Sequence, residues 1–111
     1  MRDDSFKDFV LDQVSRLGRV EARAMFGGYG LYQGKTFFGI LFKGRLYFKT
    51  SPATRVEYVR RGLRPFRPSA KQTLTSYYEV PVEIIEDDEA LTAWATLAVQ
   101  SQGRRRRQPR S

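Results

Sequence analysis

The chain has 111 residues, the usual length of one domain and too few to build two cores. Its hydrophobic fraction of 41%, with 8 Phe, 6 Tyr and 1 Trp, predicts a globular fold with an aromatic core. It contains no cysteine and no histidine, which excludes disulfides, thiolate nucleophiles, the usual zinc ligands and Ser-His or Cys-His pairs. We therefore expect a binding module rather than an enzyme, with no cofactor, no metal site and no small-molecule substrate.

The net charge of +8 is concentrated at the C-terminal end. The segment 104–111 holds five arginines and no acid, so residues 1–103 carry 15 basic against 12 acidic side chains, a net charge of only +3. We divide the chain into a folded domain over 1–103 and a disordered arginine-rich tail over 104–111. No segment is apolar enough for a signal peptide or a membrane span, so we expect a cytoplasmic protein with no membrane partner.

The first predicted element is an amphipathic helix that ends at Gly18. Its apolar positions recur at helical spacing and are Phe6, Phe9, Val10, Val14 and Leu17.

From Val20 to Thr50 the sequence predicts a three-stranded antiparallel meander, because short apolar runs are separated by glycine-containing turns. The run 37–42 is apolar without alternation, as expected of a central strand covered on both faces. Gly39 within it indicates a bulge or a close approach by another element.

A second helix is predicted to begin at Ser51, as N-cap, with Pro52 in the first turn, and to end near Gly62. We expect it to pack through Val56, Val59 and Leu63. The segment 64–71 contains two prolines and predicts a loop.

A further strand is predicted over residues 74–80, and it ends at Pro81. Asp87 or Asp88 then caps a last helix that ends near Gly103. The apolar stripe of this helix is Leu91, Trp94, Ala95, Ala98 and Val99. The fold class is therefore α+β: an antiparallel sheet flanked by helices, in the order helix, three strands, helix, one or two strands, helix.

This order of elements is common, whereas the residues of two sequence blocks are more specific for a family. The first block is the run 23–32 and the second is the run 77–81, and together with Leu46-Tyr47-Phe48-Lys49 and Trp94-Ala95 they closely resemble the N-terminal domain of the TfoX (Sxy) family of bacterial competence regulators. The resemblance covers about residues 5–100. Its motif residues are Met25, Phe26, Gly27, Gly28, Tyr29, Gly30, Tyr32, Tyr77, Tyr78 and Pro81.

This resemblance implies an α+β fold similar to secretion-chaperone-like domains. It also implies a role as a transcriptional co-regulator that acts on competence promoters with the cyclic-AMP receptor protein, and it implies no cofactor and no catalytic residue. Well-known members carry a second, C-terminal domain, whereas this sequence has only the arginine-rich segment after its last predicted helix. We therefore expect a stand-alone domain that shares the fold, and fold alone does not fix function.

Two basic segments are the candidate nucleic-acid contacts, and DNA or the transcription machinery is the expected partner. Arginine forks suit phosphate oxygens, and a flexible arginine cluster binds phosphate backbones without reading sequence. The alternatives for the basic segments are a solvated helix face followed by a polar loop, a tail that is solubilising or a cloning remnant, and binding of an acidic protein partner. The alternative for the whole domain is a homodimer or other protein interaction through an edge strand or an aromatic patch. The candidate residues are Arg55, Arg60, Arg61, Arg64, Arg67, Lys71, Arg104, Arg105, Arg106, Arg107 and Arg110.

Three other features are interpreted as having a structural role rather than a ligand-binding or catalytic one. The glycines at 27–30 fit neither dinucleotide-binding nor P-loop spacing, so we interpret them as strand bends. The acids at 86–89 are interpreted as helix-capping residues rather than metal ligands. Tyr77 and Tyr78 should point to opposite faces of a strand, one into the core and one into solvent.

Overall fold

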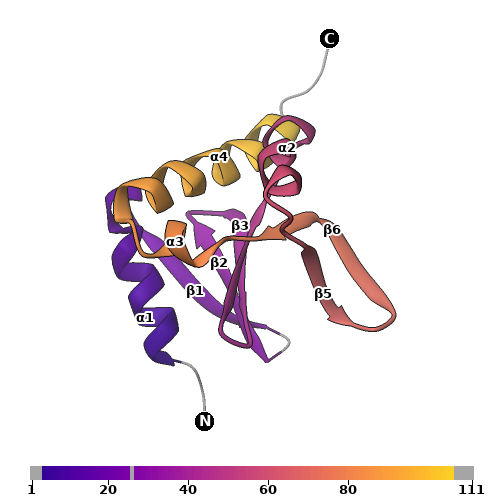
Figure 1. The fold of residues 1–111 in the computed structure, drawn as a ribbon. Helices are drawn as coiled ribbons and strands as arrows, with labels where there is room; N and C mark the ends of the chain where they lie inside the picture. The colour runs from indigo at the N-terminus through magenta and orange to yellow at the C-terminus, as the bar shows by residue number, and fades with distance from the viewer. Residues whose placement is uncertain (1–3, 26, 107–111) are drawn as a thin grey trace.

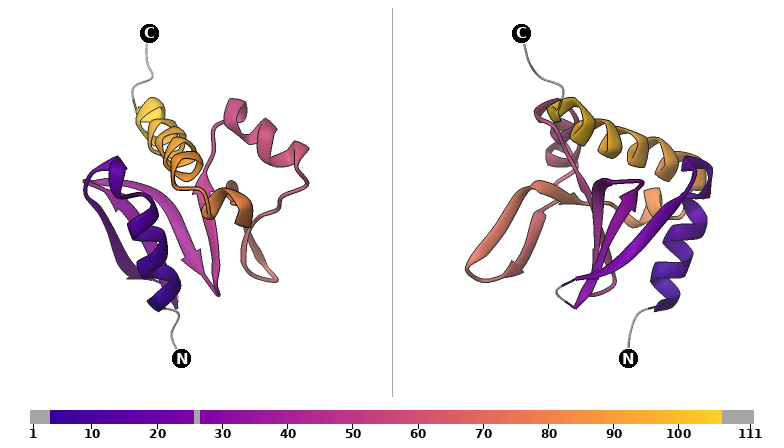
Figure 2. Two further views of the ribbon diagram at one scale, coloured as in Figure 1. Left: turned by 60° about the vertical axis from the view of Figure 1, so that its left-hand side comes forward. Right: turned by 180° about the vertical axis from the view of Figure 1, so that it is seen from behind.

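The computed structural model describes residues 4–25 and 27–106, with the backbone alone for residues 102–106. An antiparallel six-stranded sheet packs one of its faces against the helices, so the predicted α+β class is confirmed (Figure 1; Figure 2). The elements are α1 (Asp4–Gln13), a 3-10 turn (Ser15–Leu17), β1 (Val20–Met25), β2 (Gly28–Gln33), β3 (Thr36–Phe42), β4 (Arg45–Lys49), α2 (Pro52–Arg60), β5 (Pro65–Ser69), β6 (Gln72–Glu79), α3 (Val82–Ile85) and α4 (Asp88–Arg106).

The sheet order is β1-β2-β3-β4-β6-β5. The meander over residues 20–49 has four strands rather than the predicted three, because β1 pairs with β2 directly from Met25 and Gly28 onwards. The connection from β2 to β3 is a two-residue turn at Gly34-Lys35, where Gly34 has a φ of 61°. A positive φ suits glycine at the first position of such a hairpin turn.

Two glycines allow close contacts within the meander. A Cβ on Gly28 would collide with the backbone carbonyl oxygen of Leu41 on β3. A Cβ on Gly39 would lie 3.2 Å from the side chains of Leu31 and Phe48, and the β2–β3 register shifts beside it. Both features predicted for Gly39, a bulge and a close approach, are therefore present.

The main core lies between the sheet and the helices. Helix α1 contributes Val10, and the sheet contributes large buried side chains such as Phe38 and Phe48. Helix α4 presents the predicted stripe, in which Leu91, Ala95 and Ala98 are buried and Trp94 and Val99 are partly buried. The backbone of α4 continues three residues beyond Gly103, where the sequence predicted its end.

Helix α2 packs differently from the prediction. Its N-terminus forms the predicted cap, with Ser51 and Thr54 bonded reciprocally in a capping box. However, Val56 and Val59 are 60% and 56% exposed, whereas Tyr58 is buried. The expectation that these valines pack inward is wrong, because the interior volume between α2 and α4 takes the larger aromatic ring of Tyr58.

The second face of the sheet carries a separate cluster made of strand residues alone. Ile40, Tyr47, Phe66 and Tyr77 are buried there, and Phe37, Phe42 and Leu74 pack around them.

The segment predicted as a loop over 64–71 contains β5, and its prolines are tolerated because β5 is an edge strand. Tyr77 and Tyr78 do point to opposite faces, but neither is exposed, since Tyr78 packs against the main core.

The N-terminal helix is shorter than predicted. It ends at Gln13, and a 3-10 turn over Ser15–Leu17 completes the segment before Gly18. The short helix α3, which begins after Pro81, was not predicted. Among the described helices none is both long enough and apolar enough to cross a membrane.

Candidate nucleic-acid interface

Arg55, the first predicted contact, has a structural role. Its Nε donates a hydrogen bond to Oγ1 of Thr50 at 2.9 Å, and the same Oγ1 donates to the carbonyl oxygen of Ser76 at 3.0 Å. Thr50 is only 2% exposed. The guanidinium therefore ties α2 to Thr50 at the end of β4 and, through that hydroxyl, to Ser76 within β6, which limits its availability to a ligand.

Arg60 and Arg61 are held by an acid on their own helix. Both donate to the carboxylate of Glu57, at 2.6 and 2.7 Å, and the hydrogen bond from Arg61 lowers the pKa of Glu57. Arg61 also lies 3.8 Å from a carboxylate oxygen of Glu83 and 5.2 Å from the ring centroid of Trp94. The positive charge of α2 is thus partly neutralised within the molecule.

The basic residues on the β5–β6 hairpin and just before it have few partners within the chain, unlike the arginines of α2. Arg64, Arg67 and Lys71 are all exposed, and Arg67 makes a 3.4 Å hydrogen bond to the carbonyl oxygen of Ala70. No hydrogen bond or ion pair joins the side chains of Arg64 and Lys71 to any residue that the structure describes. These three cations are therefore available to solvent and to a partner.

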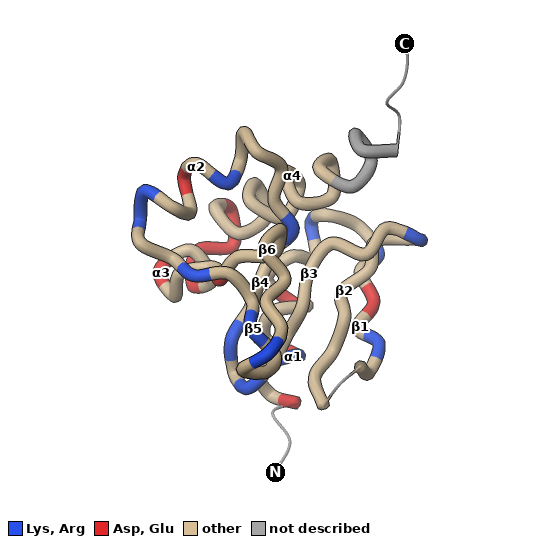
Figure 3. Tube along the Cα trace, turned by 90° about the vertical axis from the view of Figure 1, so that its right-hand side faces the viewer, with Lys and Arg blue, Asp and Glu red and all other residues tan. Residues whose placement is uncertain are grey.

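This hairpin projects from the body of the molecule as a two-stranded ribbon (Figure 1; Figure 2). The sequence from Tyr58 to Tyr78 holds five basic residues and no acid. Glu79, just beyond it, is paired with Arg45 on β4 at 2.7 Å. Figure 3 shows lysine and arginine positions distributed along α2 and the hairpin, with acidic positions on α2 and around α3.

The predicted contacts differ in their partners within the chain. Arg55, Arg60 and Arg61 bond to Thr50 or Glu57, whereas no carboxylate pairs with the three exposed cations at the hairpin in the described chain. Arg104, Arg105 and Arg106 belong to the last turn of α4, and Arg107 and Arg110 lie outside the described residues.

The tyrosines of the motif block hold the meander and α1 in place. The hydroxyl of Tyr29 donates to a carboxylate oxygen of Asp4 at 2.8 Å, and Lys7 lies 5.1 Å from its ring centroid. Tyr32 lies between the guanidinium of Arg23, at 4.4 Å, and the ring of Phe37, at 5.1 Å. Phe26 of the same block lies outside the described residues.

A row of rings on the second face of the sheet was missed by the sequence reasoning. Phe37 lies 5.5 Å from Tyr77, centroid to centroid, so Tyr32, Phe37 and Tyr77 form a continuous row. Arg23 lies against one end of this row and Lys49, 5.5 Å from the ring of Tyr77, against the other. The signal was weak because the three rings come from β2, β3 and β6.

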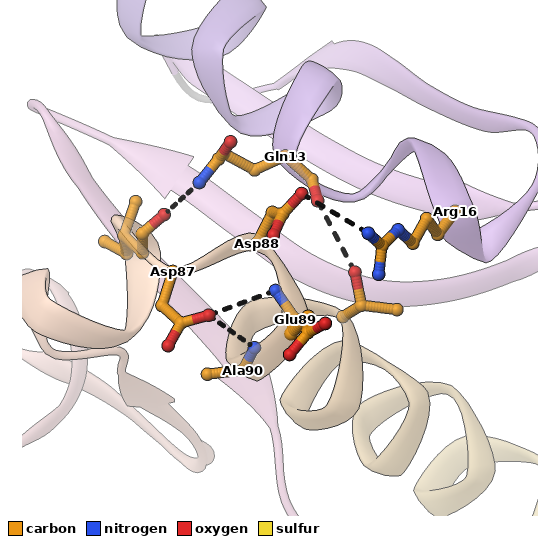
Figure 4. A network of polar contacts seen from close by, with 8 residues as sticks. Gln13, Arg16, Asp87, Asp88, Glu89 and Ala90 are labelled. Atoms are coloured by element: carbon orange, nitrogen blue, oxygen red, sulfur yellow. Dashed lines mark hydrogen bonds and ion pairs between the residues drawn. The ribbon is translucent and has the colours of Figure 1, made fainter.

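Of the acidic residues 86–89, Asp87 caps α4, as predicted, and Asp88 and Glu89 lie in the first turn of that helix (Figure 4). A carboxylate oxygen of Asp87 accepts hydrogen bonds from the backbone N–H groups of Glu89 and Ala90, at 3.2 and 3.1 Å. Asp88 pairs with Arg16 at 3.8 Å, which links α4 to the segment after α1. No group of three or more potential metal ligands occurs in the described parts of the chain.

Comparison with known proteins decides the family. The family model described as the TfoX N-terminal domain matches residues 12–102. The chain belongs to the TfoX family. This TfoX domain is also 32% identical over 69 residues to "DNA transformation protein TfoX1" of Aliivibrio fischeri, an alignment that covers 60% of this chain and 33% of that protein.

The chain thus spans about a third of the length of the curated relative that it matches. The TfoX family is competence-related and regulatory, so the resemblance drawn from the two motif blocks is confirmed. The activity and partners of this domain are a separate question.

Proposed function

We propose that this TfoX domain is a non-enzymatic regulatory module that contacts nucleic-acid backbones through its β5–β6 hairpin. The observation that carries the proposal is the exposure of three cations along a projecting two-stranded ribbon: Arg64 just before β5, Arg67 on β5 and Lys71 in the β5–β6 turn. The name of the Aliivibrio fischeri relative, a DNA transformation protein, supports the choice of partner.

The shape and charge of the hairpin suit a duplex. The major groove of B-DNA admits a two-stranded β-ribbon, and guanidinium groups form paired hydrogen bonds with phosphate oxygens. Phosphate contacts fix position and carry no sequence information directly. The arginines at 104–107 and 110 would add affinity of the same sequence-independent kind.

The test is the binding of a labelled random-sequence duplex, measured by fluorescence anisotropy at several salt concentrations. The full chain is compared with R64Q/R67Q/K71Q. Since each neutralised phosphate contributes about 0.9 to the slope of log affinity against log salt, we expect the variant to lose a slope of about 2 to 3. A variant of the five terminal arginines measures their contribution separately.

The matched control is R19Q/K35Q/K43Q, which removes the same charge from exposed positions before β1 and in the β2–β3 and β3–β4 turns. We expect it to bind the duplex more tightly than the hairpin variant does. Equal weakening by both variants would mean that net charge, and not the hairpin, determines binding. If the unaltered chain does not bind the duplex, the proposal fails.

A further inference from the structure

The two edges of the sheet differ in their capacity to accept another strand. The β5 edge carries Pro65 and Pro68, and a proline has no N–H to donate. The β1 edge contains no proline over Val20–Met25. In the described chain β1 pairs with β2 on one side, and no other strand pairs with it.

The turn between β2 and β3 shows which backbone groups of β1 face outward. Gln33 and Thr36 close a two-residue turn, so they form a hydrogen-bonded pair. Backbone groups alternate in direction along a strand, so those of Tyr32 point toward β1 and bond to Glu21 opposite. The same alternation continues along β1. Its outward-pointing N–H and C=O groups are those of Val20, Ala22 and Ala24.

We propose that β1 pairs in antiparallel fashion with β1 of a second copy of this chain, with Ala22 opposite Ala22 of that copy. In this register Val20 lies opposite Ala24 of the second copy, and the reverse pair follows from the twofold symmetry. All three outward-pointing residues then form hydrogen-bonded pairs. The product is one continuous twelve-stranded sheet made from two six-stranded sheets.

The charges on β1 favour pairing with β1 of a second copy. In the same register Glu21 lies opposite Arg23 of the second copy, and Arg23 opposite Glu21 of the second copy. Both fall in non-hydrogen-bonded pairs, where side chains approach most closely. The two side chains are 52% and 58% exposed and lie 3.4 Å apart within one chain.

Charged residues on an edge strand ordinarily discourage pairing. If the second β1 strand runs antiparallel, each Glu21 lies opposite an Arg23, and both cross-strand contacts join opposite charges. If it ran parallel and in register, Glu21 would lie beside Glu21 of the second copy. The charge pattern of β1 is therefore complementary to an antiparallel copy of itself and not to a parallel copy in register. The inference does not depend on the nucleic-acid proposal, because β1 and the β5–β6 hairpin lie at opposite edges of the sheet.

Cysteine cross-linking tests the register, because the chain has no cysteine of its own. Cα atoms of a hydrogen-bonded pair lie about 5.5 Å apart, within the range for a disulfide. We expect Ala22→Cys to give a disulfide-linked dimer on mild oxidation, seen on a non-reducing gel. Ala24→Cys is the control, because its two copies would be about 13 Å apart.

Charge reversal tests the partner by sedimentation velocity over a range of concentrations. Glu21→Arg and Arg23→Glu should each shift the protein toward monomer, and the double swap should restore the dimer. Circular dichroism of each variant verifies that the fold is kept. A monomeric parent chain at every concentration, or equal cross-linking of Ala22→Cys and Ala24→Cys, would overturn the proposal.

Discussion

Thr50 is a buried hydroxyl that joins three elements. Replacing it by valine keeps the shape of the side chain but removes the hydrogen bond to Ser76 and leaves Nε of Arg55 without this acceptor. We expect Thr50→Val to lower the free energy of unfolding by about 1–3 kcal/mol, measured by urea denaturation. Thr75→Val, at an exposed position on β6, is the control and should change it by less than about 0.5 kcal/mol. Equal losses in both would contradict a special role for Thr50.

Tyr58 makes stability depend on alkaline pH. Burial raises the pKa of Tyr58 well above its ordinary value, so the folded chain resists ionisation that the unfolded chain undergoes near pH 10. The contribution of Tyr58 to the free energy of unfolding is therefore fully present below about pH 10 and is lost as the pH rises above that value. Tyr58→Phe should lessen this fall, as measured by urea denaturation between about pH 8 and 11. Tyr47, whose pKa is also raised, would account for part of the loss that remains. An unchanged fall in Tyr58→Phe would refute the assignment.

The pairing of β2 with β3 depends on a missing side chain. In Gly28→Ala the new methyl group would meet the carbonyl oxygen of Leu41, which is backbone and cannot swing away. We expect a loss of stability of about 1–3 kcal/mol, the usual cost of overpacking. Gly30→Ala is the comparison, because its nearest neighbours are the side chains of Met25, Phe37 and Tyr32, which have more freedom to move. Thermal unfolding of both variants ranks them, and a larger loss in Gly30→Ala would contradict the explanation.

Among the helices and strands, the sequence predicted best those features in which a local sequence pattern matches the packing of the core. The α4 stripe and the Ser51 cap were predictable because helical spacing and capping are local properties. Helix α2 was assigned correctly but oriented wrongly, since Val56 and Val59 match helical spacing and only the tertiary structure selects Tyr58. The proline rule favoured a loop at β5, and pairing with β6 overrode it.

For the whole molecule, the family could be predicted from two motif blocks, but the surface could not. Six candidate cations over residues 55–71 look equivalent in the sequence. In the structure Arg55, Arg60 and Arg61 are engaged within the chain, and this depends on contacts with Thr50 and Glu57 that charge counting does not reveal. Among these six cations, those without an ion pair or a side-chain hydrogen-bond partner in the described chain are therefore the ones at the β5–β6 hairpin. Basic residues can be proposed as an interface only after their hydrogen-bond and ion-pair partners within the chain are known.

The strand order has a consequence for how the chain folds. In the described sheet β4 and β6 are the neighbours that do not follow one another in sequence, because α2 and β5 come between them. The entropy of closing that long loop must be spent before the pair makes its contacts, so we expect this seam to form late. The β1–β4 meander and the β5–β6 hairpin are joined internally by short turns and can form early. The β1 edge and the β5–β6 hairpin belong to different early units, so we expect the strand pairing within each unit to form before β4 pairs with β6.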